Sequence, residues 1–127
     1  NSSIAKQIVD DLIQIERPLA VDVANYFLDM KKVFSEMHRI LKTGGKACTI
    51  IGNTKMRGIK ILNAQVAAEQ MQVAGFKKVA FIKREIPNKR ITPWRDLESG
   101  KFTGKKNLSK THAHAYEFEY VVVMEKS

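Results

Sequence analysis

The spacing of hydrophobic residues predicts two amphipathic helices in the first third of the chain. Residues 4–16 and residues 22–42 each carry a hydrophobic side chain at every third or fourth position. Pro18 lies between the two segments, as the end of the first helix or its connector, and Asp22 is a suitable N-cap for the second. We therefore expect a short surface helix followed by a long helix with one continuous buried face.

A short apolar strand is predicted after the long helix. Gly44-Gly45 supplies the left-handed turn that ends a helix, and residues 46–52 are then apolar at nearly every central position. Strands without alternation are typically covered on both faces, as in a parallel sheet flanked by helices. Residues 53–60 are polar and contain glycine, so we expect a loop at the carboxyl end of this strand, where open α/β sheets bind ligands.

The second half of the chain predicts one helix and two strands, with a long loop between the strands. Residues 61–74 have helical spacing, residues 76–86 have an apolar centre, and residues 116–124 form the last strand. Residues 87–115 show no sustained period, and unstructured connections of this length are uncommon unless they are functional or disordered. We expect all 127 residues to form a single α/β domain, with helices flanking a mostly parallel sheet and a long basic loop at 87–115.

The positive charge is concentrated in one part of the chain. Between Lys77 and Lys110 lie 11 basic and 3 acidic residues, a net +8 of the total +9. Charge gathered in one segment favours a polyanionic partner such as nucleic acid, although solvated surface lysines also explain it.

Composition also excludes several classes of protein. The single cysteine, Cys48, rules out an intrachain disulfide framework, and its apolar surroundings predict a small buried side chain. No apolar run approaches the roughly 20 residues of a membrane span, and the N-terminus does not have the layout of a signal peptide. We expect a soluble, cytoplasmic protein without a membrane partner or a metal site.

The order of these elements resembles the C-terminal half of a class I S-adenosylmethionine-dependent methyltransferase. The most specific motif is FSEMHRILKTGG at residues 34–45, which is similar to the family signature E-x-x-R-x-L-K-P-G-G with Thr43 in the proline position. The tripeptide AGF at 74–76 matches the family's usual Gly-Phe step. The segments YFLDM at 26–30 and REIPNK at 84–89 look most like the amino-methyltransferases of DNA.

The resemblance implies a three-layer, Rossmann-like fold with a seven-stranded sheet. This chain would supply the fifth, sixth and seventh strands, the last one antiparallel and inserted between its neighbours. In the intact family enzyme, a methyl group passes from S-adenosylmethionine to adenine N6 or cytosine N4 of a base rotated out of the duplex.

Two family motifs are absent from the sequence: the Gly-rich turn that holds the cofactor and the Asp/Asn-Pro-Pro-Tyr/Phe motif that binds the target amine. We therefore expect no catalytic or cofactor-binding residues in this chain and no S-adenosylmethionine bound by it alone. Its expected partners are DNA and the missing N-terminal half or a partner subunit. An RNA methyltransferase fragment and a non-catalytic nucleic-acid-binding module are the alternatives.

The candidate nucleic-acid-binding residues lie after the central strand and in the basic segment. Asn53 is placed to line a pocket, or else to end the strand by bonding to backbone. A tryptophan in a basic loop has the chemistry to stack on a base, or else anchors the loop to the core. The full set is Asn53, Lys55, Arg57, Arg84, Lys89, Arg90, Trp94 and Arg95.

Overall fold

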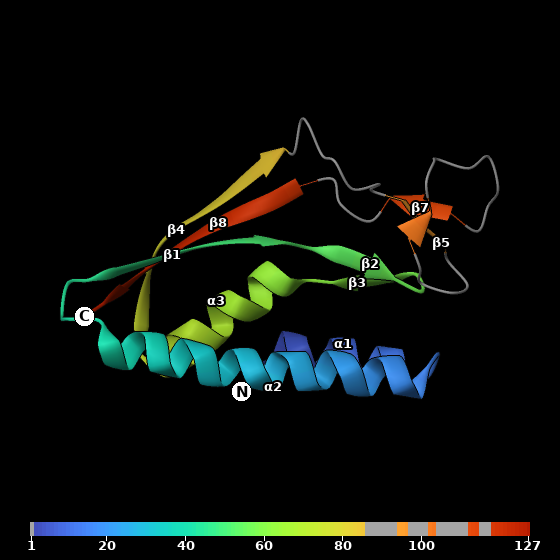
Figure 1. The fold of residues 1–127 in the computed structure, drawn as a ribbon, viewed down its shortest axis with the longest axis horizontal. Helices are drawn as coiled ribbons and strands as arrows, with labels where there is room; N and C mark the ends of the chain where they lie inside the picture. Colours follow the sequence, from blue (N-terminus) through green and yellow to red (C-terminus); the bar gives the residue numbers. More distant parts are fainter. Residues whose placement is uncertain (1, 86–93, 97–101, 104–111, 115–117) are drawn as a thin grey trace.

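The computed structural model describes residues 2–85, 94–96, 102–103, 112–114 and 118–127 (Figure 1). For the strands within 94–114, it describes the backbone only. Within these ranges three helices lie on one side of a three-stranded sheet, and a hairpin extends from the end of its first strand.

The three helices are α1 (Ser3–Ile13), α2 (Arg17–Ile40) and α3 (Asn63–Ala74). Helix α2 begins five residues before the predicted start, because Pro18 fits the first turn, where its missing N–H costs no hydrogen bond. Asp22 is therefore inside the helix, and its prediction as the N-cap is wrong. Gly75 ends α3 in the left-handed conformation, with φ of 114°, as the sequence predicts.

The main sheet has the strand order β1 (Lys46–Gly52), β8 (Phe118–Lys126), β4 (Phe76–Glu85). The last strand lies between the other two and is antiparallel to both, as expected. The expectation of a mostly parallel, Rossmann-like sheet is wrong, because every strand pair in the described residues is antiparallel. The inserted β8 keeps the codirectional strands β1 and β4 apart, so they form no parallel pair with each other.

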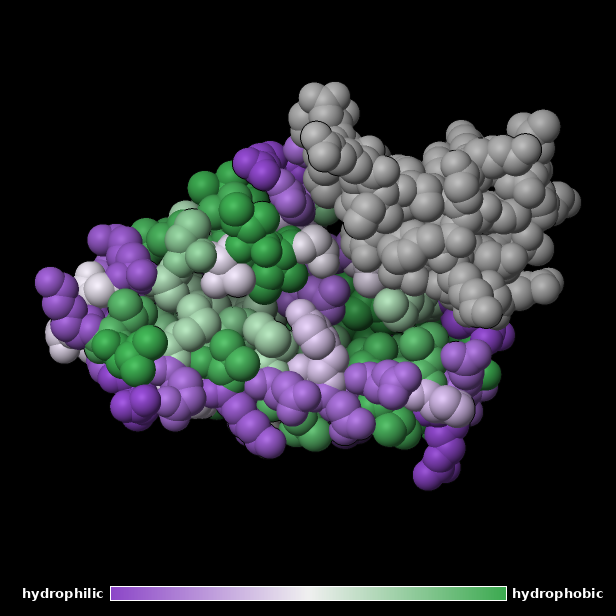
Figure 2. All heavy atoms as spheres, viewed as in Figure 1, coloured by the Kyte–Doolittle hydropathy of each residue, from purple (hydrophilic) through white to green (hydrophobic). Residues whose placement is uncertain are grey.

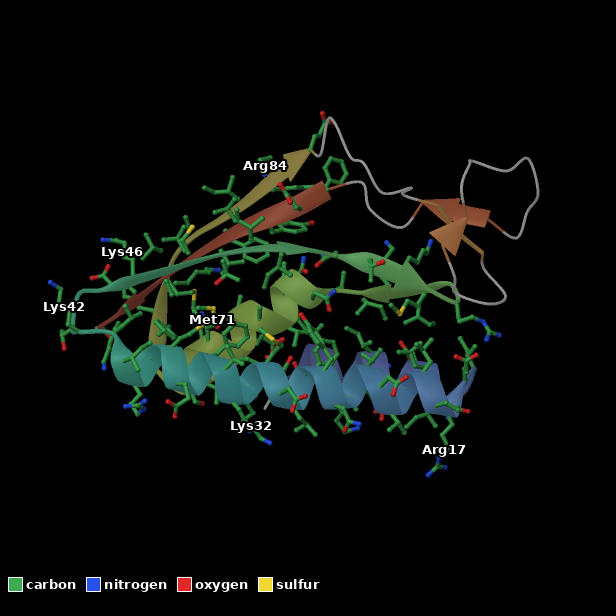
Figure 3. The ribbon with its side chains drawn as sticks, in the orientation of Figure 1. Arg17, Lys32, Lys42, Lys46, Met71 and Arg84 are labelled. Atoms are coloured by element: carbon green, nitrogen blue, oxygen red, sulfur yellow. The ribbon has the colours of Figure 1, made fainter. Side chains whose placement is uncertain are left out.

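The expectation of three layers is also wrong, since the described helices cover only one face of this sheet (Figure 1). A hydrophobic core lies between that face and helices α2 and α3; its fully buried members include Phe34, Met71, Val122 and Met124. Met71 projects from α3 into this core, whereas Arg17 and Lys32 point away from the sheet on the far side of α2 (Figure 3).

The outer face of the sheet carries exposed hydrophobic side chains. Register places Cys48 opposite Val123, and Ile50 opposite Val121, which in turn lies opposite Ile82. Ile50 is 58% exposed and Ile82 is 52% exposed. Cys48 is exposed rather than buried, so the prediction for its side chain is wrong as well. Figure 2 shows hydrophobic atoms gathered over the sheet, above a hydrophilic band along α2.

The segment predicted as a loop after β1 is a hairpin, formed by β2 (Thr54–Met56) and β3 (Ile59–Ile61). Its two-residue turn has positive φ at both positions, 51° for Arg57 and 81° for Gly58, which matches the right-handed twist of paired strands. The hairpin packs its inner face on a second core cluster with α1 and the first half of α2, which includes Leu12, Phe27 and Ile61.

The predicted long loop at 87–115 contains three short strands: β5 (Trp94–Asp96), β6 (Phe102–Thr103) and β7 (His112–His114). They pair antiparallel in the order β6-β5-β7. The sequence pattern did not indicate these strands, and the rest of the segment lies outside the described residues.

The Gly44-Gly45 turn is held by the end of the last strand. Gly44 has φ of 84°, and its N–H donates to the Lys126 carbonyl at 2.6 Å, while the Lys126 N–H donates to the Gly45 carbonyl at 2.9 Å. Lys126 Nζ also donates to the carbonyls of His38 and Leu41, both at 2.8 Å. A cation at this position complements the negative end of α2.

Candidate nucleic-acid interface

The carboxyl ends of β1 and β4 lie at the same end of the main sheet, on either side of β8. Both strands are antiparallel to β8, and Gly52 and Arg84 both lie opposite Glu119. Asn53 follows Gly52 directly, and the hairpin that carries Lys55 and Arg57 continues from the same end. Four of the predicted residues are thus brought to one end of the sheet or to the hairpin that leaves it (Figure 1).

Asn53 connects the end of β1 to the start of α3. Its Oδ1 accepts a hydrogen bond from the Ala64 N–H at 2.9 Å, and its Nδ2 donates to Gln65 Oε1 at 2.7 Å. Helix α3 has no hydrogen bond from the side chain of its own N-cap, Leu62. Asn53 therefore supplies the acceptor that a capping side chain normally provides.

Two of the predicted cations are paired with carboxylates. Arg57 Nη1 lies 2.8 Å from Glu16 Oε1, and the two side chains are 24% and 38% exposed. Arg84 Nε donates to Glu119 Oε1 at 2.8 Å, and the guanidinium also contacts the same oxygen through Nη2. The pair with Glu16 fixes the Arg57 guanidinium at the turn of the hairpin, and the pair with Glu119 fixes the Arg84 guanidinium at the end of the main sheet (Arg84 is labelled in Figure 3). Lys55 forms no ion pair with any of the residues described.

The remaining predicted residues lie in the basic segment. Trp94 and Arg95 belong to β5, opposite Thr103 and Phe102 of β6. Lys89 and Arg90 lie outside the described residues. The nucleic-acid roles predicted for all eight residues stay predictions.

An open groove that the sequence did not reveal lies between α2 and the hairpin. It has a volume of about 430 Å³, within the range of small-molecule sites. Its polar side chains are Asp22 and Tyr26 from α2, Thr54 from β2, and Asn63 from the first turn of α3. Sequence reasoning missed it because one of its walls is a hairpin that was predicted as a loop.

The clearest pKa shifts belong to surface helix pairs. A hydrogen bond from Arg39 lowers the pKa of Glu36, and a hydrogen bond to Asp10 raises the pKa of Lys6. In the part of the chain that is described, no group of three or more His, Cys, Asp or Glu residues is arranged to hold a metal ion. Among those same residues, no helix has the length and hydrophobicity needed to span a membrane.

Comparison with solved structures finds a candidate DNA modification methylase from Thermus thermophilus. Its TM-score is 0.55 at 16% sequence identity, over 83% of this chain. The matched region is 38% of the length of that protein. A scan against models of protein families finds no match, and neither does a search of curated proteins. The structural similarity shows a methyltransferase-like fold for this chain, and it does not distinguish subtypes.

Proposed function

We propose that this chain is the part of a DNA methyltransferase that completes the sheet and contacts the DNA backbone. In the whole enzyme, a methyl group would pass from S-adenosylmethionine to an exocyclic amine, at adenine N6 or cytosine N4. The similarity in fold to a candidate DNA modification methylase over 83% of the chain is the observation that supports this most strongly. The concentration of positive charge after residue 76 supports DNA as the partner.

The proposal assigns DNA contacts to the predicted cations and to Trp94. Arg84, Lys89, Arg90 and Arg95 would bind phosphates of the backbone, together with Lys55 and Arg57 on the hairpin. Trp94 would stack on an unpaired or flanking base, and Asn53 would position the edge of the sheet. Contacts of this kind give affinity and register rather than sequence specificity.

The proposal assigns the cofactor and the catalytic motif to another polypeptide segment or subunit. The sequence lacks the Gly-rich turn and the Pro-Pro motif, and the exposed hydrophobic side chains of Ile50 and Ile82 on the outer face of the sheet offer a surface on which that segment would pack. We expect no binding of S-adenosylmethionine by this chain alone. Saturable binding of the labelled cofactor would contradict this part of the proposal.

Binding to a fluorescent duplex DNA at several salt concentrations tests the DNA contact. About six phosphate contacts should lower the affinity by roughly 1,000-fold between about 50 and 200 mM salt. Changing Lys89, Arg90 and Arg95 to Gln should reduce both the affinity and the salt slope. The control variant changes Lys6, Lys31 and Lys32 on the helices to Gln, with the same loss of charge and little effect expected.

The outcomes separate the proposal from its two rivals. Affinity that is the same for DNA and a neutral polymer, or that does not change with salt, contradicts any nucleic-acid role. Stronger binding to structured RNA than to duplex DNA supports an RNA methyltransferase. If the chain binds DNA but no candidate partner yields methyl transfer, the chain is a non-catalytic nucleic-acid-binding module. The absence of the two family motifs from the sequence is the observation that favours this alternative.

A further inference from the structure

Helix α2 carries a row of exposed hydrophobic side chains beside its buried face. Every seventh residue from Leu19 onward is hydrophobic, and the row is Leu19, Tyr26, Val33 and Ile40. The last three of these are 46%, 45% and 70% exposed. Residues seven apart lie almost in line along a helix, so the row extends over about 32 Å. Single exposed hydrophobic residues are ordinary, but a continuous apolar row indicates a contact site.

A row of carboxylates runs along α2 beside the apolar row. Asp22, Asp29 and Glu36 are all exposed, and each lies three positions after a member of the apolar row. Asp22 and Asp29 form no ion pair with any described residue, and Glu36 pairs with the exposed Arg39 of the same helix at 2.7 Å. These carboxylates are therefore accessible to cations of another molecule, although the chain as a whole carries a net charge of +9. The two rows together are called the docking stripe.

The docking stripe adjoins the core on one side and ends in a groove. Met30 and Met37 each lie four positions after a member of the apolar row, and they are half-buried against the main core. Methionine side chains are flexible, so they adapt to the shape of a partner. At the other end, Leu19 and Tyr26 line the groove of about 430 Å³ between α2 and the hairpin. A bulky apolar side chain that fills this groove would anchor a helix lying along the stripe.

We propose that the docking stripe binds a basic amphipathic helix of a partner polypeptide. The apolar side of that helix would pack on the apolar row, and its lysine or arginine side chains would meet the three carboxylates. Apolar residues at heptad spacing with charges on the flank are the pattern by which two helices pair side by side. The stripe lies on the helices, whereas the exposed Ile50 and Ile82 lie on the outer face of the sheet. The inference therefore concerns a separate surface and does not depend on the proposed function.

The same charges disfavour a second copy of the chain as the occupant. If two stripes paired in parallel, each row of carboxylates would face the carboxylates of the other copy. If they paired antiparallel, each apolar row would face those carboxylates instead. Like charges in contact and carboxylates buried against apolar side chains both cost free energy. A helix that brings cations satisfies both rows at once.

Calorimetric titration of the whole chain with designed helical peptides tests the inference. A peptide of about 28 residues, four heptads, carries leucine at two positions of each heptad and lysine at the flanking position. A second peptide has glutamate in place of every lysine. At near-physiological salt, the lysine peptide should bind about tenfold or more tightly than the glutamate peptide. The net charge of +9 acts in the opposite direction, so this preference reports a local acidic surface.

Two double substitutions on α2 test the apolar row. Val33→Ala with Ile40→Ala should weaken binding of the lysine peptide by about fivefold or more, because both side chains lose apolar contact area. The matched control is Val21→Ala with Leu28→Ala. These residues are also seven apart on α2 and are 49% and 57% exposed, but they lie on its other flank. The control should leave binding unchanged, and alanine favours the helix at all four positions.

A charge reversal tests the carboxylate row. Asp22→Lys with Asp29→Lys should reverse the preference, so that the glutamate peptide binds more tightly than the lysine peptide. Asp10→Lys with Asp11→Lys makes the same change in net charge at exposed positions of α1. If the effect is local, this control keeps the preference for the lysine peptide. Circular dichroism of each variant confirms that the helices are retained.

Four outcomes would overturn the inference: binding of neither peptide, equal binding of both, equal losses for the two alanine variants, or reversal of the preference by both charge variants. If the variant at Val33 and Ile40 abolishes self-association of the chain, the occupant is a second copy and the inference is wrong. Duplex DNA binding should be unchanged in all these variants, because none of the substituted residues is a proposed DNA contact. Loss of DNA binding in the unaltered chain would contradict the proposed function alone.

Discussion

Gly75 shows how a single residue is fixed by both its backbone and its neighbour. Its φ of 114° is strained for any residue with a side chain, and a Cβ at this position would lie 2.8 Å from His38 Nε2. His38 in turn contacts Phe76 edge to face, with ring centroids 5.0 Å apart. The glycine that ends α3 was predictable from the sequence. Its contact with His38 was not, because His38 lies on α2, far from Gly75 and Phe76 in the sequence.

Gly75→Ala should therefore lower the free energy of unfolding by about 2–3 kcal/mol in total, which is more than backbone strain alone would cost. Gly44→Ala is the matched control, because Gly44 also has positive φ but a Cβ added to it would have no other atom within 4 Å. Its expected cost is about 1 kcal/mol. Chemical denaturation measures both. Equal losses for the two variants would show that the contact with His38 contributes nothing, and His38→Ala should rescue part of the loss in Gly75→Ala.

Asn53 illustrates the limit of residue-level prediction at the candidate site. Its place after a buried strand left two roles open, and the side chain uses both its donor and its acceptor on α3. Asn53→Ala should cost about 1 kcal/mol of stability, as loss of a capping acceptor does elsewhere. Asn25→Ala, at an exposed position of α2, should be neutral or slightly stabilising. A change in DNA affinity larger than the change in stability would show a direct nucleic-acid contact.

At the scale of elements, the sequence predicted the helices well and the strands less well. Helical spacing reports burial on one side, which α1, α2 and α3 show. The apolar run in β1 predicted burial on both faces, yet Ile50 is exposed, because strand composition does not report what covers each face. The hairpin was missed because its turn is Arg57-Gly58 rather than Asn-Gly or Asp-Gly, the strongest hairpin signals.

The junction between α2 and β8 gives a testable example of contact between elements. Lys126 Nζ donates to two carbonyls at the end of α2, where its charge also complements the helix dipole. Lys126→Met nearly keeps the length of the side chain and removes both hydrogen bonds, so we expect a loss of about 1–2 kcal/mol. Lys42→Met removes the same charge from an exposed nearby position and should change stability by less than about 0.5 kcal/mol. Thermal unfolding of the two variants at equal salt provides the comparison, and similar midpoints would contradict this role of Lys126.

At the scale of the whole molecule, the outer face of the sheet is the feature that composition did not predict. Hydrophobic content alone does not show whether one or both faces of a sheet are covered, and here α1, α2 and α3 all lie on the same side (Figure 1). The concentration of charge was visible in the sequence, because it depends only on residue order. The antiparallel arrangement was not, since it depends on where strands from distant parts of the chain pair.

The exposed outer face should make the isolated chain self-associate. Ile50 and Ile82 lie opposite the same residue, Val121, and both are more than half exposed, so together they form the centre of an apolar patch. Changing both to Thr keeps strand propensity and removes apolar surface, and it should shift the apparent mass toward the monomer without lowering the melting temperature. The control variant changes Ile13 and Val21 to Thr. These two side chains lie on α1 and α2 and are 44% and 49% exposed. Sedimentation velocity across a range of concentrations measures the effect. If the unaltered chain is monomeric, or if the control variant shifts equally, this face does not drive association. The assignment of a covering partner to this face would then fail as well.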